Sequence, residues 1–224
     1  MSSSIAPRID VISDAICPWC YIGKRQLERA LAILAEKGLH FDVAWHPFQL
    51  NPDMPEEGME RAAYLRAKFG EDGGGDRYAR VRAAGASVGL DFAFDRIRRT
   101  PNTLQAHRLI RWSAAIGAQD AMVEALFRAY FLEGEDVGDK ATLARIAASV
   151  GFAEADAAAY LAGDRDAEAL RAEDAFARQV GITGVPCFIV DRKFAISGAQ
   201  PPEAFLEIFE AARREADQPE AEAV

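Results

Sequence analysis

The chain has 224 residues, enough for a sizeable core, and half of them are hydrophobic. Acidic residues outnumber basic ones by 35 to 26, and the net charge of −9 argues against a nucleic-acid or anionic-membrane partner. No apolar run approaches the roughly 20 residues of a membrane span, and no basic-then-apolar leader opens the sequence. We therefore expect a cytoplasmic protein with no nucleic-acid or membrane partner, in a compartment that keeps thiols reduced.

The first part of the chain has the pattern of a strand–helix–strand unit. Residues 9–13 are mostly apolar, residues 21–37 carry apolar side chains at helical spacing, and residues 39–45 alternate. Gly38 supplies the expected helix stop. A strand, a helix and a second strand in this order predict a βαβ unit with a buried parallel pair.

Between the first strand and the helix lies Cys17-Pro18-Trp19-Cys20. Pro18 suits the first helical position, where its missing N–H would have no partner, and Cys17 then falls at the helix N-cap. The free N–H groups and the positive end of the helix dipole favour a thiolate on Cys17. Cys20 is close enough to attack a mixed disulfide formed at Cys17. The spacing therefore predicts a reactive dithiol.

A zinc site is the alternative interpretation of two cysteines at this spacing. Structural zinc takes four ligands, and the sequence has no second C-x-x-C, while its one H-x₅-H pair is His40 and His46. Cys187, His40, His46 and His107 could complete a site only if folding brought them together. With three cysteines in all, a disulfide scaffold is implausible. We favour redox use and expect no metal.

From Pro47 onwards, helical patterns follow one another almost without a strand. The predicted helices are residues 57–69, 76–88, 102–116, 119–132, 140–150, 154–161 and 166–180. Strand patterns return in residues 187–191 and 194–197, which form a hairpin pattern, and Pro201-Pro202 open a last amphipathic helix. Residues 215–224 are an acidic tail that we expect to be disordered.

Four segments together point to a family. They are Ser13-Asp14-Ala15-Ile16-Cys17-Pro18-Trp19-Cys20-Tyr21-Ile22-Gly23, Asn102-Thr103-Leu104-Gln105-Ala106-His107-Arg108-Leu109, Gly181-Ile182-Thr183-Gly184-Val185-Pro186 and Phe194-Ala195-Ile196-Ser197-Gly198-Ala199-Gln200. On these segments the chain resembles the DsbA family of the thioredoxin superfamily, in its FrnE-like branch. The resemblance implies an α/β thioredoxin-like fold interrupted by a large all-helical insertion. Residues 1–52 and 165–214 would form a discontinuous thioredoxin-like domain, and residues 53–164 the insertion.

The resemblance also implies a second part of the site. In that family the residue before a cis-proline lies beside the reactive cysteine, and its backbone pairs with an extended substrate. We therefore expect a cis Val185–Pro186 bond, against the trans form common for X–Pro, and substrate binding at Val185 and Pro186. Trp19 is expected to be an exposed apolar contact for the substrate, with an ordinary surface aromatic as the alternative.

Three further residues each have two interpretations. Asp14 either ends the first strand in an Asx-type turn, or tunes the pKa of Cys20 and shuttles its proton. Cys187 is either a small buried hydrophobe or a third redox thiol. His107 lies among apolar residues of a predicted helix, where it either packs or contacts a ligand.

Three functions remain open at this point. The first is a thiol–disulfide oxidoreductase that acts on a disulfide-containing protein or small molecule through a mixed disulfide at Cys17, resolved by Cys20. The second is a glutathione-dependent isomerase or transferase, because the branch is similar to 2-hydroxychromene-2-carboxylate isomerases and kappa-class glutathione transferases. Those enzymes usually carry a single Ser or Cys, so Cys20 weighs against this reading. The third is a non-enzymatic redox-sensing accessory protein. We expect no bound cofactor, with glutathione as a candidate co-substrate.

Overall fold

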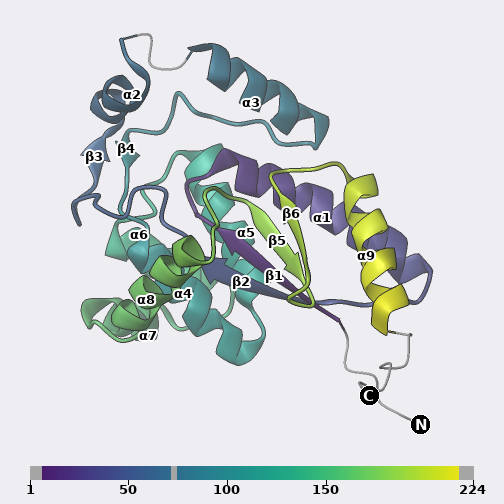
Figure 1. Cartoon of the computed structure of the whole chain (residues 1–224). Helices are drawn as coiled ribbons and strands as arrows, with labels where there is room; N and C mark the ends of the chain where they lie inside the picture. The colour runs from purple at the N-terminus through teal and green to yellow at the C-terminus, as the bar shows by residue number, and fades with distance from the viewer. Residues whose placement is uncertain (1–6, 72–74, 217–224) are drawn as a thin grey trace.

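A four-stranded mixed sheet lies at the centre of the computed structural model, which describes residues 7–71 and 75–216 (Figure 1). The strand order is β2-β1-β5-β6, from β1 (Arg8–Ser13), β2 (Asp42–Pro47), β5 (Cys187–Val190) and β6 (Phe194–Ser197). Strands β1 and β2 are parallel, as the βαβ pattern predicts, whereas β5 is antiparallel to β1 and β6 is antiparallel to β5. The sheet therefore joins the N-terminal βαβ unit to the C-terminal hairpin.

Different helices cover the two faces of this sheet. On one face lie α1 (Pro18–Glu36) and α9 (Pro202–Ala216), where the ring centroids of Phe188 and Phe205 are 4.8 Å apart. On the other face α8 (Ala167–Gln179) places Ala177 in a cluster with Cys187. Because successive residues of a strand point to opposite faces, Cys187 and Phe188 belong to these two layers.

The helices predicted between the two parts of the sheet are present, with shifted ends. They are α2 (Arg61–Phe69), α3 (Gly75–Ser87), α4 (Leu104–Ser113), α5 (Gln119–Arg128), α6 (Lys140–Ser149), α7 (Glu154–Ala162) and α8. A 3₁₀ turn (Ala114–Ile116) extends α4, and a π-helical turn (Ala129–Glu133) extends α5. None of the helices in the described ranges is long and apolar enough to cross a membrane.

The expectation of an all-helical insertion is wrong in one detail. Strands β3 (Met59–Glu60) and β4 (Arg99–Thr100) pair antiparallel within it, so the helix predicted from residue 57 begins only at Arg61. A ladder of two residues is too short to leave an alternating pattern in the sequence. The second predicted strand is also displaced, from residues 39–45 to β2.

The core extends from the central sheet into the helices between β2 and β5, called the helical segment below. The main cluster of buried side chains contains Val11 from β1, Leu27 from α1, Leu126 from α5 and Leu143 from α6. The two predicted domains therefore share one core. The predicted boundaries between them, at residues 53 and 165, stay a prediction. Of the expected acidic tail, residues 215 and 216 belong to α9, and residues 217–224 lie outside the described ranges.

A histidine on the edge strand β2 ties the sheet to the helices on its second face. His46 Nε2 lies 2.8 Å from Asp10 Oδ1 in β1, and His46 Nδ1 lies 2.5 Å from Glu173 Oε1 in α8. Arg111 of α4 in turn donates to Glu173 at 3.0 Å. Burial alone would lower the pKa of His46, but hydrogen bonds and charge from Glu173 and Asp10 outweigh it and raise this pKa. The histidine therefore carries a positive charge in the folded state more readily than when unfolded.

We predict that this cluster makes stability depend on pH. Because the folded-state pKa of His46 is raised, its contribution is fully present below the unfolded pKa of about 6.5 and is lost as pH rises through the folded value. In urea unfolding, His46→Asn should lower the free energy of unfolding by about 0.5–1 kcal/mol more at pH 6 than at pH 9. The exposed His40→Asn is the control, and an equal loss at both pH values would contradict the assignment.

Candidate active site

The two cysteines lie at the start of α1, immediately after β1. Cys17 is the N-cap residue and Pro18 occupies the first turn, as the sequence predicts. The turn before the helix is held by the Cys17 N–H, which donates to the Asp14 carbonyl at 3.0 Å, and Cys20 N–H donates to the Cys17 carbonyl at 3.0 Å. The Cys17 side chain therefore lies at the positive end of the α1 dipole, where a negative charge is stabilised.

The loop before β5 lies against the same turn. The Val185–Pro186 bond is cis, and the Cys17 thiol donates to the Val185 carbonyl with 3.6 Å between sulfur and oxygen. The close approach of α1 to this loop depends on Gly23. A Cβ atom at Gly23 would lie 2.9 Å from Pro186 Cγ and 3.0 Å from Phe188 Cζ. The fold thus brings together Cys17, Val185 and Pro186, which are far apart in the sequence.

Cys17 and Cys20 are both buried, and burial raises the pKa of Cys20. Cys17 is 4% exposed and Cys20 is 1% exposed, and both are free thiols. Burial first, and then the hydrogen bond and charge of Cys17, raise the pKa of Cys20 well above its ordinary value, against weaker opposing hydrogen bonds from the Ser13 side chain and the Asp14 backbone. Cys20 is therefore held as a thiol at neutral pH.

The third cysteine lies on the opposite face of the sheet. Cys187 packs with Ile12, Phe48 and Ala177, and burial raises the pKa of its thiol. Its side chain also lines a pocket of about 430 Å³ with Ile182 and other residues of the loop before β5. Within the described ranges no three His, Cys, Asp or Glu side chains gather in a way that could hold a metal.

Trp19 and Asp14, on either side of Cys17 in the sequence, differ in exposure. Trp19 is 40% exposed, so the residue between the cysteines presents an aromatic surface to solvent. Asp14 is fully buried, and its Oδ2 accepts the Leu50 N–H at 2.7 Å, in the segment that follows β2. Its carboxylate thus holds a distant segment rather than its own turn. The interaction of Asp14 that bears on Cys20 is the one from its backbone.

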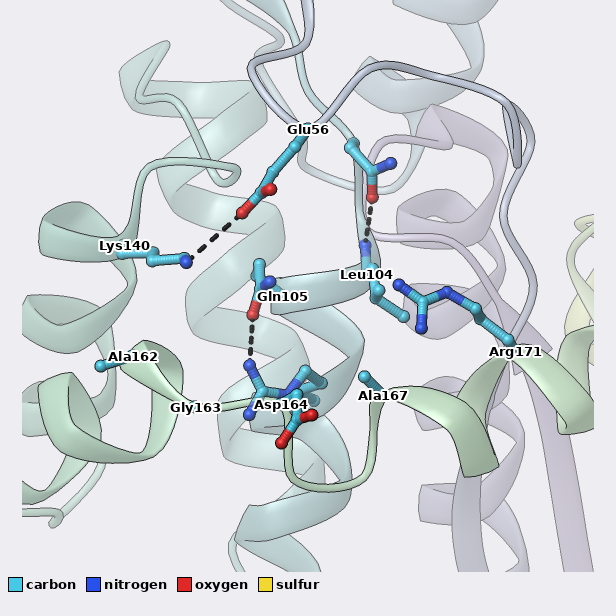
Figure 2. A pocket seen from close by; sticks show the side chains of 11 residues that line it. Glu56, Leu104, Gln105, Lys140, Ala162, Gly163, Asp164, Ala167 and Arg171 are labelled. Atoms are coloured by element: carbon cyan, nitrogen blue, oxygen red, sulfur yellow. Dashed lines mark hydrogen bonds and ion pairs between the residues drawn. The ribbon is translucent and has the colours of Figure 1, made fainter.

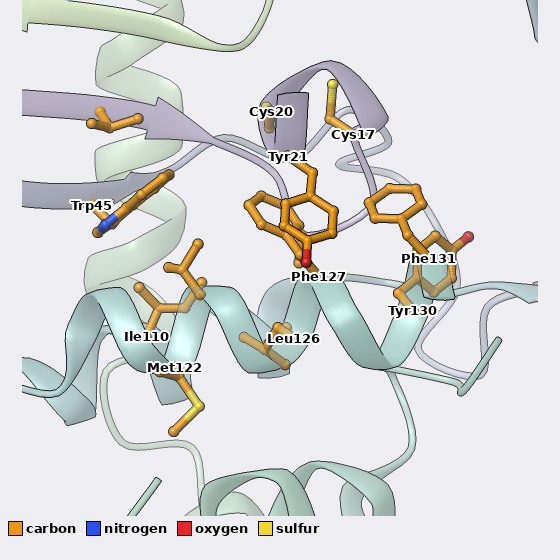
Figure 3. Close-up of a cluster of buried hydrophobic side chains, with 14 of the residues drawn as sticks. Cys17, Cys20, Tyr21, Trp45, Ile110, Met122, Leu126, Phe127, Tyr130 and Phe131 are labelled. Atoms are coloured by element: carbon orange, nitrogen blue, oxygen red, sulfur yellow. The ribbon is translucent and has the colours of Figure 1, made fainter. Parts of the chain in front are cut away.

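Side chains of α1 contact α5 and hold the two helices together. The sequence pattern did not predict these contacts. Figure 3 shows Tyr21, directly after Cys20, pointing from α1 towards Phe127, with 4.9 Å between the ring centroids. Lys24, only 2% exposed, lies 3.1 Å from Asp120 and 3.2 Å from Glu124. The sequence gives no signal that Lys24 is buried, because Glu28 is an ordinary i,i+4 partner on the same helix and the other two carboxylates lie about a hundred residues away.

A further pocket lies among the helices. It has a volume of about 430 Å³ and is lined by Asn102, Leu104 and Gln105 of the α4 region, with Lys140 of α6 and Arg171 of α8 (Figure 2). None of the predicted site residues lines it. Arg108 is fully buried in its wall and donates to the carbonyls of Tyr160, in the last turn of α7, and Arg165, in the segment between α7 and α8. We therefore assign this arginine to holding α4 against α7.

Comparison with known proteins agrees with this architecture. The family profile described as a DSBA-like thioredoxin domain matches residues 8–210. The chain is similar to the structure of a probable DsbA oxidoreductase from Streptomyces coelicolor, with 29% identity, a TM-score of 0.84, and coverage of 97% of this chain and 94% of that one.

Two other solved structures share the fold at lower identity. The cytosolic disulfide reductase DsbM from Pseudomonas aeruginosa, solved with glutathione, has 17% identity and a TM-score of 0.64 over 92% of this chain and 99% of that one. A 2-hydroxychromene-2-carboxylate isomerase has 14% identity and a TM-score of 0.65 over 93% of this chain and 96% of that one.

We predict that Gly23→Ala destabilises the protein. Alanine improves helix propensity by about 1 kcal/mol, but the new Cβ overlaps the rigid Pro186 ring and Phe188, and such overpacking costs about 1–3 kcal/mol. Urea unfolding should therefore show a net loss. Ala32→Ser, on the exposed face of α1, is the control and should change stability by less than about 0.5 kcal/mol. If Gly23→Ala were more stable than the wild type, the space between α1 and Pro186 would be large enough for a methyl group, and the prediction would be wrong.

We also predict selective alkylation of the three cysteines. Because burial raises the pKa of Cys20 and Cys187, these two remain thiols at pH 7, and iodoacetamide should modify Cys17 first. Peptide mapping by mass spectrometry during the reaction measures the order. Modification of Cys187 before Cys17 would contradict this ranking.

Proposed function

Because the chain belongs to the DSBA-like thioredoxin domain family, we propose that it is a thiol–disulfide oxidoreductase that attacks with Cys17 and resolves with Cys20. The observation that carries the proposal is the pairing of a dithiol at a helix N-terminus with the Val185 carbonyl, 3.6 Å from the Cys17 sulfur. A disulfide substrate bound along Val185 would meet Cys17 directly.

The reaction follows in two steps. The Cys17 thiolate, stabilised at the positive end of α1, attacks one sulfur of the substrate disulfide, and the other sulfur leaves as a thiolate. Cys20 then attacks the Cys17 sulfur, which forms the Cys17–Cys20 disulfide and releases the second substrate thiolate. The substrate is reduced and the dithiol is oxidised by the same two electrons. Run in reverse, the pair oxidises a substrate dithiol.

The residues around Cys17 support binding of an extended substrate. We expect the backbone of Val185, whose carbonyl lies against the Cys17 sulfur, to pair with a peptide-like segment. The exposed ring of Trp19, two residues from Cys17, offers an apolar contact to such a substrate. Substrates of this description include disulfide-containing proteins and small disulfides. In a cytoplasmic setting, the reduced poise favours the reductase direction.

A glutathione-dependent reaction is the second candidate. It is favoured by the shared fold with DsbM, whose structure contains glutathione, and with the 2-hydroxychromene-2-carboxylate isomerase. Glutathione would then act as a co-substrate that enters at Cys17. The buried thiol of Cys20 argues against an isomerase or transferase, because chemistry that only activates glutathione needs one sulfur. A redox-sensing accessory protein without turnover is the third candidate.

Substitution of each cysteine separates these functions. Cys17→Ser should abolish reduction of a small disulfide, whereas Cys20→Ser should trap the mixed disulfide and lower turnover by at least about 100-fold. Activity is followed as thiol release, and the trapped species by mass spectrometry. Cys187→Ser is the matched control and should retain activity.

Each of the three candidate functions predicts a different result in these assays. Full disulfide reduction by Cys17→Ser would refute the proposal. Glutathione conjugation or isomerisation by an active Cys20→Ser protein would establish the second candidate. A disulfide that forms reversibly in glutathione buffers, with no turnover by the wild type, would establish the third.

A further inference from the structure

Arg108, in the middle of α4, is a buried cation without a carboxylate partner. Its side chain is 0% exposed, and it donates to the Arg165 carbonyl at 2.7 Å, the Tyr160 carbonyl at 2.8 Å and Gln105 Oε1 at 2.6 Å. All three acceptors are uncharged, and Arg108 forms no ion pair within the described ranges. Arginine is almost never fully buried unless it is paired, because an isolated charge is costly to remove from water. The positive charge of Arg108 therefore lacks compensation from the chain.

The buried lysine of this protein has the opposite surroundings. Lys24 of α1 is 2% exposed and forms ion pairs with three carboxylates, those of Glu28, Asp120 and Glu124. In the part of the chain that the structure describes, Lys24 and Arg108 are the only buried lysine or arginine side chains. The missing acidic partner is thus particular to Arg108, and a compensating negative charge has to come from the space beside it.

The space beside Arg108 is the pocket of about 430 Å³ that Figure 2 shows. Its volume lies within the roughly 300–1,000 Å³ of small-molecule sites. A guanidinium carries five N–H groups, and the three hydrogen bonds of Arg108 leave two of them without a partner among the described residues. A carboxylate in this pocket can therefore accept hydrogen bonds from Arg108 and neutralise its charge.

Two further features favour an anion in the same pocket. Arg171 of α8 lines it, has no hydrogen-bond or ion-pair partner among the residues that the structure describes, and reaches towards Leu104 in Figure 2. Leu104 and Ala167 are the first residues of α4 and α8, and both line the pocket. The positive ends of two helix dipoles therefore lie at its wall, where a negative charge is stabilised.

The acidic residues of the lining restrict which anion fits. Glu56 forms an ion pair with Lys140 at 3.3 Å, so these two charges cancel. Asp164 also lines the pocket and has no ion-pair partner within the described ranges. Its carboxylate repels a second negative charge, such as that of a phosphate dianion, and attracts an ammonium group. Leu104 and Ala162 add apolar surface to the lining.

We propose that this pocket binds a free amino acid with an apolar side chain. The carboxylate of the ligand lies between Arg108 and Arg171, its ammonium group lies against Asp164, and its side chain packs on Leu104. Binding involves no covalent step. None of the lining residues belongs to the candidate active site, so the proposal does not depend on thiol–disulfide exchange.

Isothermal titration calorimetry with probes of one shape tests this charge pattern. The probes are L-leucine, 4-methylpentanoate, which lacks the ammonium group, and 3-methylbutylamine, which lacks the carboxylate. L-leucine should bind the wild type. Each of the other two should bind at least about 10-fold more weakly, because a hydrogen bond between charged groups is lost. Inorganic phosphate is the fourth probe and should bind more weakly than L-leucine.

Substitutions of exposed side chains assign the two ends of the ligand. Arg171→Gln should weaken binding of L-leucine by about 10-fold or more. Asp164→Asn should also weaken binding of L-leucine, but it should bind 4-methylpentanoate at least as tightly as the wild type does, since a repulsive charge is removed. Arg80→Gln replaces an exposed arginine of α3 outside the lining and, as the matched control, should bind like the wild type. Arg108 is left in place because it holds α4 against α7.

Several results would overturn the proposal. One is no binding of L-leucine up to about 10 mM, a concentration that nearly saturates a site with a Kd of about 1 mM. Others are equal affinity for L-leucine and 4-methylpentanoate, wild-type binding by Arg171→Gln, and tighter binding of phosphate than of L-leucine. None of these results bears on the reaction at Cys17 and Cys20, which the cysteine variants test separately.

Discussion

The contact between α1 and the cis Val185–Pro186 loop is the constraint on which the site depends. At Gly23 the helix backbone comes so close to Pro186 that any side chain would overlap the ring. Because of this approach, the Cys17 sulfur at the helix N-terminus reaches the Val185 carbonyl. Two segments separated by more than 160 residues meet at one sulfur, and their spacing is set by backbone packing rather than by flexible side chains.

The opposite side of α1 is held by groups from the helical segment. Tyr21 stacks on Phe127 and donates to Glu124 at 2.8 Å, while buried Lys24 reaches carboxylates of α1 and α5. Lys24 is buried while its carboxylate partners are partly exposed, so desolvation of the lysine offsets the attraction, but removal of the partners would leave a buried charge uncompensated, which is costly. Their effect is to set the orientation of α1. The helical segment therefore helps to position the dithiol, and is more than a cover over the sheet.

The parts of the site that could be predicted from the sequence are those that depend only on residues close together in the chain. Pro18 next to Cys17 placed the N-cap correctly, because the preference of proline for the first turn acts over a few residues. The juxtaposition of Cys17 with Val185 was expected only from a resemblance, since no local pattern links them. The contact between Asp14 and His107 was not predicted. A histidine among apolar helix residues has the same pattern whether it packs or meets a buried carboxylate, and its partner lies 93 positions away.

The different environments of the two sulfurs bear on which chemistry the site can support. Cys20 is 1% exposed against 4% for Cys17, so it is the less accessible of the two buried sulfurs to an external substrate. Its hydrogen-bonding neighbours are Cys17, Ser13 and the Asp14 backbone. The sulfur that lies next to Cys20 is therefore that of Cys17. A site that only activated glutathione would gain nothing from a second thiol restricted in this way, whereas a dithiol mechanism requires that restriction. The burial of Cys20, more than its spacing from Cys17, thus favours an exchange that ends in a disulfide between the two.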